Sequence, residues 1–507
     1  MGWVRRCIVS LLLSWLFLLP SGVYGAPVRL SLSEALKTTL RENKIIQAYS
    51  IGKAIAEDRI GAEKGIYDPF ISSSTYWSRD KTTILGNNTV GSLDSLIVSG
   101  GVGQKNSIGG TSSVNMSYER EVTKYQIPFR LEDNLSRIYF KYDQPILRGF
   151  GQAITNLKIS RAKIGREFSE QQYEEMKSGA VYAAYKAYLN LYLSLEQEQL
   201  IREVRQSSEE IYRIVKEKYE VRKLTVTDLN KIEATLLQQD NELVRLRNAI
   251  TQNRRELLFA IYSDSGSPED PEVDPVTSPD RIAAAAAAFQ KEETLGLKKK
   301  YDFDLISMRN DLSLLEKDLV EARDAMKPDL SISAELGVSG YSPTDAGRSV
   351  KDISGDNYSA RVKGTLMLPV KNTAARSRQS EVMNRIRQME VQIARKEHEV
   401  EKTVQTLQAD METMQKRIAL NERVVSITDQ NLRNETERLI AEKSTLLDTL
   451  QFQTDFSSAR LSLVQSKVDY LMLVGTYRYF RREMETFTDD SLYGEGSAGG
   501  YAVSTGN

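Results

Sequence analysis

The chain of 507 residues contains one cysteine (Cys7), one histidine (His398), and 68 Lys and Arg against 69 Asp and Glu. A single cysteine and a single histidine exclude a Cys/His zinc cluster, a disulfide framework and a Cys–His nucleophilic pair. A net charge of −1 gives no electrostatic footprint for nucleic acid, and 27% charged with 40% hydrophobic residues excludes a disordered chain or a polytopic helical membrane protein. Function must therefore come from shape, packing or carboxylates, and we expect no metal and no cofactor.

The first 25 residues are predicted to be a secretory signal peptide. Arg5 and Arg6 form a basic start, and the run Ile8–Leu19 is apolar. About twelve apolar residues are too few to cross a bilayer of roughly 30 Å as a helix. Cys7 precedes the apolar run and cannot serve as a lipid-acceptor cysteine, so the mature chain is expected to lack cysteine.

The mature chain repeats one order of elements: a helix, strands, a very long helix, a reversal and a returning helix. We assign residues 26–262 to the first repeat and residues 281–485 to the second. Between them, residues 263–280 are rich in proline and aspartate without apolar periodicity, which predicts a polar linker. Residues 486–507 are expected to form a polar, disordered tail. After the signal peptide no stretch approaches 18 uninterrupted apolar residues, so we expect no transmembrane helix.

Each repeat changes from helical to strand periodicity at a proline. Ser31 and Glu34 form a capping-box pattern at the start of the first helix. After Pro69, and again after Pro328, the sequence takes on the composition or the period-2 alternation of strands. The expected strands cover about 69–79, 112–143, 329–340 and 357–369. Residues 80–111 are dense in glycine, and the sequence leaves open whether they add strands or form a loop.

Alternating strands of about ten residues, separated by polar loops and dotted with tyrosine, are the weak signature of an outer-membrane barrel. A soluble sheet with one polar and one apolar face has the same pattern. Alternation alone does not decide between these two structures.

The helical signal is stronger. No proline occurs from about residue 152 to residue 222. In the second repeat, apolar residues recur at spacings of 3, 4 or 7 from Val382 to Leu439, which is a sustained heptad seam and predicts a left-handed coiled coil. A helix of about 70 residues spans roughly 105 Å. Because no globular core could surround such a helix, its partner must be the other repeat or other copies of the chain.

Each long helix reverses at a matching sequence, KLTVTDL at Lys223–Leu229 and KSTLLDT at Lys443–Thr449. Lys223, Thr225, Val226 and Asp228 each have a counterpart 220 residues later, namely Lys443, Thr445, Leu446 and Asp448. A threonine that caps a returning helix, with an aspartate in its first turn, is an ordinary helix start. The constant offset favours an internal duplication.

Four pieces of the sequence, taken in order, carry a family resemblance. They are the Leu30-Ser31-Leu32 start with Glu34, Ala35 and Asn43, the helix stop over 62–69, the YDQPILRGFG run over 142–151, and the two K-x-T-x-x-D reversals. Together they resemble the TolC-type outer membrane efflux protein family. The resemblance covers about Leu30 to Met484, and QPILRGFG at a strand-to-helix junction is its most specific part.

The resemblance implies a mainly α fold with a β-barrel part. Long coiled-coil helices would form a periplasmic α-barrel, and about four strands per protomer would enter a shared trimeric transmembrane β-barrel. The implied function is a homotrimeric, non-enzymatic channel, the exit duct of a tripartite efflux or type I secretion system. The implied partners are a periplasmic adaptor (membrane fusion) protein, an inner-membrane transporter and outer membrane lipid. The implied location is the outer membrane of a Gram-negative-type bacterium, with a long periplasmic part.

The resemblance also assigns roles to the two reversals, the tips at 222–228 and 442–448. The implied adaptor contacts are Arg222, Lys223, Thr225, Asp228, Glu442, Lys443 and Thr445. Asp448 falls at the pore entrance, where three copies of one aspartate would form a ring whose repulsion a cation or a displaced helix relieves. Gln451 stands where many relatives have a second acidic residue. Because Arg222 and Glu442 replace the family's usual tip glycines, the tip geometry stays open.

Two other classes of protein are weighed against the channel. A periplasmic coiled-coil adaptor or scaffold would share the helical hairpins but should lack tyrosine-rich strands and the LRGFG-like junction. An exported carboxylate-based hydrolase would need acidic residues that converge, whereas here they lie along charged helix faces, and His398 lies among charges in RKEHEV. The nature of the cargo is not encoded in any motif.

Overall fold

The computed structural model describes residues 28–81, 84–85, 88–125, 130–264, 273–287, 294–441 and 443–489. The predicted signal peptide lies outside these residues, as does the tail from residue 490 onward. Contacts divide the chain into two compact units, and each unit takes segments from both predicted repeats. Unit 1 comprises Met1–Gln47, Met176–Thr294 and Val404–Asn507, and unit 2 comprises Ala48–Glu175 and Leu295–Thr403.

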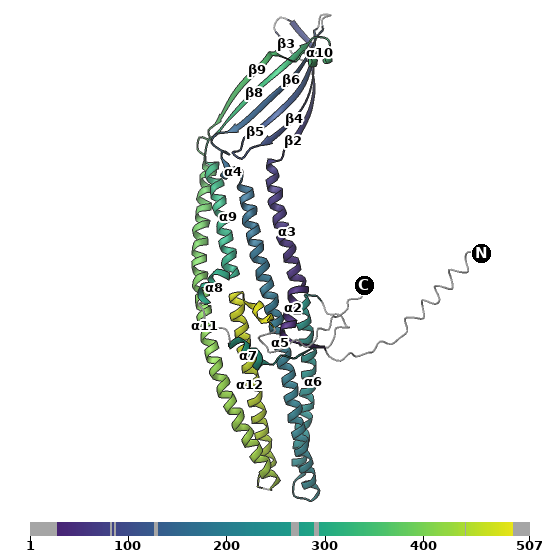
Figure 1. Ribbon diagram of the computed structural model, residues 1–507, viewed down its shortest axis with the longest axis vertical. Helices are drawn as coiled ribbons and strands as arrows, with labels where there is room; N and C mark the ends of the chain where they lie inside the picture. The colour runs from purple at the N-terminus through teal and green to yellow at the C-terminus, as the bar shows by residue number, and fades with distance from the viewer. Residues whose placement is uncertain are drawn as a thin grey trace, which may run out of the picture. The chain divides into compact units, whose positions relative to one another are not determined.

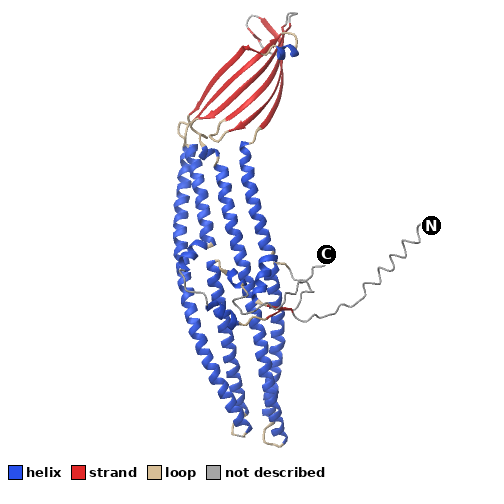
Figure 2. Cartoon of the chain, in the orientation of Figure 1, coloured by secondary structure: helices blue, strands red, loops and turns tan. Residues whose placement is uncertain are grey.

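Helices form most of the described chain (Figure 2). In the first half they are α2 (Leu32–Glu42), α3 (Lys44–Lys64), η1 (Gly65–Tyr67), α4 (Gln152–Thr155), α5 (Leu157–Glu220) and α6 (Val226–Tyr262). In the second half they are α7 (Pro279–Ala287), α8 (Thr294–Tyr301), α9 (Phe303–Ala325), α10 (Ala346–Lys351), α11 (Thr373–Ile440), α12 (Leu446–Arg481) and η2 (Met484–Thr488). The two very long helices predicted from the sequence are confirmed, since α5 has 64 residues and α11 has 68.

The predicted seam accounts for the length of α11. Its positions Val382, Val400, Val404, Leu407 and Leu439 are buried, and the remaining seam positions are half-buried. Apolar side chains at spacings of 3 and 4 give one continuous stripe, so the helix can be stabilised by packing along its length. None of the helices in the described ranges is long and apolar enough to cross a membrane.

The largest core lies in unit 1. Its biggest fully buried side chains include Tyr185, Tyr188 and Phe487, and the Tyr185 ring stacks on Phe487 with 5.2 Å between centroids. Phe487 lies in the segment predicted to be disordered. The prediction that the tail begins at residue 486 is therefore wrong for residues 486–489, because the buried Phe487 ring packs against the core.

Part of the predicted polar linker also belongs to the core. The strand β1 (Val28–Leu30) pairs in parallel with β7 (Val273–Pro275). Thr277 is fully buried, accepts a hydrogen bond from Leu32 N–H (3.1 Å), and its own N–H donates to the Tyr188 hydroxyl (2.9 Å). Residues 273–280 are thus a structural part of unit 1 and not a free linker, while residues 265–272 lie outside the described residues.

Unit 2 contains an antiparallel sheet whose strands lie side by side in the order β2-β4-β5-β6-β8-β9 (Figure 1). The strands are β2 (Phe70–Asp80), β3 (Ile84–Leu85), β4 (Asn88–Lys105), β5 (Thr111–Tyr125), β6 (Arg130–Pro145), β8 (Asp329–Ser342) and β9 (Ser354–Met367). The short β3 pairs only with β4. Among the described residues the sheet thus has six long strands, so the expectation of about four is wrong.

The glycine-dense segment that the sequence left open forms β4. Two of its glycines are needed because neighbouring side chains lie over them on one face of the sheet. A Cβ at Gly103 would come within 2.6 Å of the Phe70 ring, and one at Gly101 would collide with the Asn115 side chain. Glycine in this strand therefore reflects close side-chain packing and not a loop.

The junction between the sheet and the long helix lies where QPILRGFG predicts it. The strand β6 ends at Pro145, and α4 begins at Gln152. Gly149 (φ +79°) and Gly151 (φ +100°) adopt backbone conformations that L side chains rarely take. The Gly149 N–H also donates to the Asp324 carboxylate at 2.7 Å, which fixes the turn against α9.

The core of unit 1 provides a test of packing at Gly475. A Cβ there would collide with the Tyr185 ring, so we expect Gly475→Ala to destabilise the protein by about 1–3 kcal/mol. Gly179→Ala in α5 is the matched control, because its Cβ would meet no described atom within 4 Å. Thermal unfolding of the purified chain should show a lower Tm for Gly475→Ala only. Equal Tm changes for both variants would contradict this account of the core.

Candidate functional site: the sheet faces and the helical tips

One face of the sheet, called here the apolar face, carries a band of exposed apolar side chains. The strand register places on it Ile71, Trp77, Val98, Val102, Val114, Met116, Ile138, Phe140, Leu336, Tyr358, Val362 and Leu366. Ile71 is 85% exposed and Val362 is 80% exposed. A contiguous exposed surface of this kind is typical of a protein or membrane contact.

The opposite face, called here the polar face, is built from small and charged residues. Arg137 pairs with Glu119 on the neighbouring strand at 3.0 Å, and Arg361 pairs with Glu335 at 3.5 Å. Serine and glycine occupy much of the rest of β2 and β4 on this face. The sheet therefore offers one surface suited to hydrocarbon and one suited to water.

The first predicted tip is a tight helix reversal. Thr225 is the N-cap of α6, and its side chain and that of Asp228 form a reciprocal capping box. The pKa of Asp228 is lowered by hydrogen bonds from the Thr225 hydroxyl and then from the Thr225 backbone N–H. Because the ionised carboxylate is the stabilised form, this local stabilisation is present at neutral pH and is lost as the pH falls through the lowered pKa.

Arg222 adopts a left-handed turn, the conformation for which the family resemblance predicts glycine. Its φ is +60°, and the N–H of Lys223 donates to the Lys218 carbonyl at 2.8 Å, as in a Schellman motif. An L residue in this conformation costs roughly 1–2 kcal/mol. The second tip has the equivalent bond from Lys443 N–H to the Arg438 carbonyl, also at 2.8 Å. Glu442, the counterpart of Arg222, lies outside the described residues.

The predicted entrance residues lie in the first two turns of α12. The Asp448 carboxylate accepts a hydrogen bond from the Thr445 hydroxyl at 2.6 Å, and Thr445 caps the helix by accepting from Asp448 N–H. The Gln451 side chain donates to Asp455 at 2.8 Å. Asp448 and Gln451 are both exposed, and their side chains are held by local bonds within α12 and its cap.

A small apolar cluster brings the two tips together. It joins α5, α6, α11 and α12 through Ile211, Val215, Ile232, Leu439 and Leu446. The Lys218 ammonium adds a bond to the Leu439 carbonyl at 2.9 Å. The four helices that form the two tips are thus packed together in unit 1.

A buried polar chain beside this cluster was not foreseen from the sequence. Gln239 donates to the Ser208 hydroxyl (2.8 Å), which donates to Gln453 (3.2 Å), which in turn donates to the Val204 carbonyl (3.0 Å). Ser208 is fully buried and Gln453 is 3% exposed. The sequence does contain one signal for this chain, which is helical spacing. Ser208 lies three residues before the buried Ile211, and Gln453 lies seven residues after the buried Leu446, so each is on the same helix face as a buried apolar residue.

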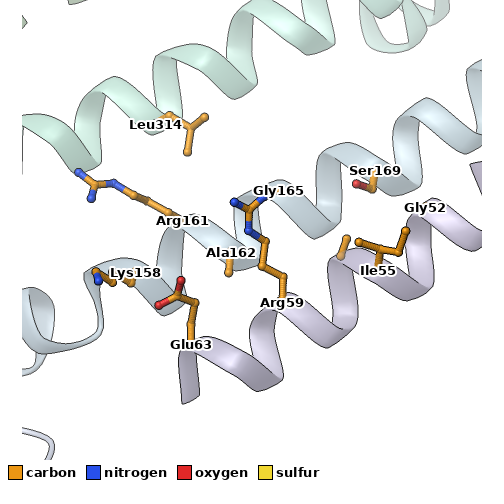
Figure 3. Close-up of a pocket in the computed structure, with 11 residues that line it drawn as sticks. Gly52, Ile55, Arg59, Glu63, Lys158, Arg161, Ala162, Gly165, Ser169 and Leu314 are labelled. Carbon is orange, nitrogen blue, oxygen red and sulfur yellow. The ribbon is translucent and has the colours of Figure 1, made fainter. Parts of the chain in front are cut away.

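A pocket among α3, α5 and α9 carries no convergent chemistry in its described residues. A pocket of about 480 Å³ is lined by residues of α3, α5 and α9, among them Ile55, Arg161 and Leu314 (Figure 3). Arg161 is already paired with Asp318 at 2.6 Å and with Glu321. Within the described ranges, no three His, Cys, Asp or Glu side chains are grouped to hold a metal ion.

Comparisons with known proteins give the class of the fold. The chain matches the Campylobacter jejuni CmeC outer membrane channel (16% identity, 89% of this chain and 86% of that one, TM-score 0.57). It matches the Vibrio cholerae outer membrane protein VceC (12%, 89% and 96%, TM-score 0.62) and the open state of the Neisseria gonorrhoeae MtrE outer membrane channel (14%, 90% and 88%, TM-score 0.59). No family model and no curated protein matches the sequence.

This protein therefore has the fold of the outer membrane efflux channels. The predicted resemblance to the TolC type is confirmed at the level of the fold, which is what identities of 12–16% can establish. The sheet strands and the long helices occur in the parts of the chain where the sequence predicted them. The roles of the tip and entrance residues stay predictions.

The buried polar chain generates a prediction about the tips. Gln453→Ala removes the partner of Ser208 and of the Val204 carbonyl, and unsatisfied buried groups cost about 1–3 kcal/mol. We expect backbone amides around Ser208 to exchange hydrogen about tenfold faster or more. Gln451→Ala, at an exposed position of the same helix, is the control and should change exchange by less than about twofold. The same acceleration in both variants would show that the buried chain does not hold the tips.

Proposed function

We propose that this protein is an outer membrane channel that acts as the exit duct of a tripartite efflux or type I secretion system. The observation that carries the proposal is the two-faced sheet. The apolar face extends along β8 from Leu330 to Val338, a span of nine residues or about 27 Å, which suits a hydrocarbon layer. The polar face would line a water-filled lumen. Cargo crosses such a duct passively, without a reaction and without a cofactor.

Three copies of the chain form the proposed channel. Within the described residues, β2 and β9 are the edges of the sheet and each pairs on one side only. Unpaired edges are not stable in a membrane, and closure into a shared barrel removes them. Exposed apolar residues at helical spacing, such as Leu420, Val424 and Ile427 in α11, are suited to packing against a neighbouring copy.

The proposed partners bind at the tips and beyond them. A periplasmic adaptor protein would contact the exposed reversal residues Arg222, Lys223, Thr225, Asp228, Glu442, Lys443 and Thr445. An inner-membrane transporter would deliver the cargo through the adaptor. The matching caps at Thr225 and Thr445 are consistent with two repeats, 26–262 and 281–485, after a cleaved signal peptide of residues 1–25.

The proposed gate lies at the same end of unit 1. Three Asp448 side chains around the pore axis would repel one another, and Gln451 would leave the ring single. The apolar cluster and the buried chain through Gln453 would hold the tips closed against this repulsion. Adaptor docking would open the duct by moving α11 and α12 away from α5 and α6.

Membrane fractionation tests the channel against the scaffold alternative. We expect the full chain in outer membrane fractions as trimers that dissociate on heating, because the apolar face needs hydrocarbon. The variant Ile71→Asp, which puts a charge on the apolar face, should reduce insertion. Ser72→Asp, on the polar face of the same strand, is the control and should insert as wild type does. A soluble periplasmic monomer would overturn the proposal.

Conductance in planar bilayers tests the entrance. Removing the carboxylate in Asp448→Ala should abolish block by divalent cations and raise conductance severalfold, because the ring no longer repels or traps ions. Asp455→Ala, seven residues further from the tip along α12, is the charge-matched control. Unchanged conductance and unchanged cation block in Asp448→Ala would exclude the assigned role.

A further inference from the structure

A basic hollow of about 300 Å³ lies on the sheet at the end away from the long helices. Four cationic side chains from three strands line it or adjoin it, Arg79 of β2, Arg120 and Lys124 of β5, and Arg130 of β6. Trp77 lines the same hollow. The register places these four cations on the apolar face, and not on the polar face that would line the lumen.

The hollow directly follows the apolar band. On β5, Met116 belongs to the band, Arg120 lies four residues further, and Lys124 four residues beyond that. Two residues along a strand span about 7 Å, so the first cation lies within about 14 Å of the band. Trp77 pairs with Leu96 in the row that carries Arg120, which is where an interfacial aromatic residue belongs in a membrane barrel.

Cations exceed carboxylates in this hollow. Arg79 is bound to Asp94 at 2.5 Å, and Glu132 accepts from both Arg120 and Arg130 at 2.8 Å. These pairs hold the arginines in place but neutralise only two of the four charges. Lys124 makes no ion pair or hydrogen bond within the described part of the chain. An anion bound here would therefore interact with positive charge that no carboxylate neutralises, and the arginine side chains that it contacts are already held in position.

We propose that the basic hollow binds the phosphate of a lipid headgroup in the outer leaflet of the membrane. The inference rests on the proposed function, which puts the apolar face against lipid and this end of the sheet at the outer surface. Guanidinium groups recognise phosphate oxygens through paired hydrogen bonds, and lysine adds a point charge. A headgroup bound here keeps its acyl chains beside the apolar band, which a free phosphate ion cannot do.

Binding is tested on the full chain in detergent by titration with three probes: bisphosphorylated lipid A, the same lipid after enzymatic removal of its phosphates, and inorganic phosphate. Wild type should bind the phosphorylated lipid at least tenfold more tightly than either of the others. Lys124→Gln should weaken that binding about fivefold, and Lys124→Gln with Arg130→Gln at least tenfold. Lys124→Arg should retain it.

The matched control is Arg361→Gln with Lys363→Gln, which removes the same charge from the polar face of β9. Its affinity for the phosphorylated lipid should equal that of wild type. Equal binding of the dephosphorylated lipid, equally tight binding of inorganic phosphate, or an equal loss in the control would each overturn the inference. Since Lys124 makes no ion pair or hydrogen bond with a described residue, circular dichroism should show an unchanged fold in Lys124→Gln.

The same variants distinguish the inference from the proposed function. If Lys124→Gln still fractionates as an outer membrane trimer but binds phosphorylated lipid as wild type does, the hollow is not the site and the channel proposal stands. If wild type does not enter the membrane, the channel proposal fails regardless of the affinity for lipid.

Discussion

The antiparallel register of the sheet is the constraint on which the rest of the proposed channel depends. Because side chains alternate across a strand, pairing Val102 with Val114 and Val114 with Phe140 also sends Glu119 and Arg137 to the opposite face. A slip by one residue would mix the two faces and destroy both surfaces. The apolar band, the polar face and the basic hollow are therefore three consequences of one alignment.

The long helices depend on a different regularity, the heptad spacing of apolar residues. At the tips, buried polar residues add to the apolar packing. At the tips, Ile211 and Val215 of α5 and Leu446 of α12 belong to an apolar cluster, and Ser208 and Gln453 beside it form a hydrogen-bonded polar chain. A hydrogen-bonded polar chain among apolar side chains favours one alignment of the helices. A shift that leaves one of its buried groups without a partner costs more free energy than the loss of an apolar contact. This combination suits the gate that we propose at the tips.

The fold predicted from the sequence was correct where local physics decides the structure. The threonine caps at Thr225 and Thr445, the glycine junction before Gln152 and the long helices all follow from short-range rules. The errors lie where distant segments decide. Phe487 and Thr277 were assigned to a tail and a linker although both are buried by residues far away in sequence, and strand β4, which the sequence left undecided, depends on the packing of its glycines beneath Phe70 and Asn115.

The sequence by itself determined the period of each segment, the stops between segments and the resemblance of the two tips, because these depend on neighbours a few residues away. Only the tertiary structure decided the number of strands, the two faces of the sheet and the polar link between Ser208 and Gln453. Each of these depends on which segments, far apart in the sequence, lie next to each other in the fold. The free energy of such a pairing depends on both segments together. No single segment of the sequence therefore encodes it.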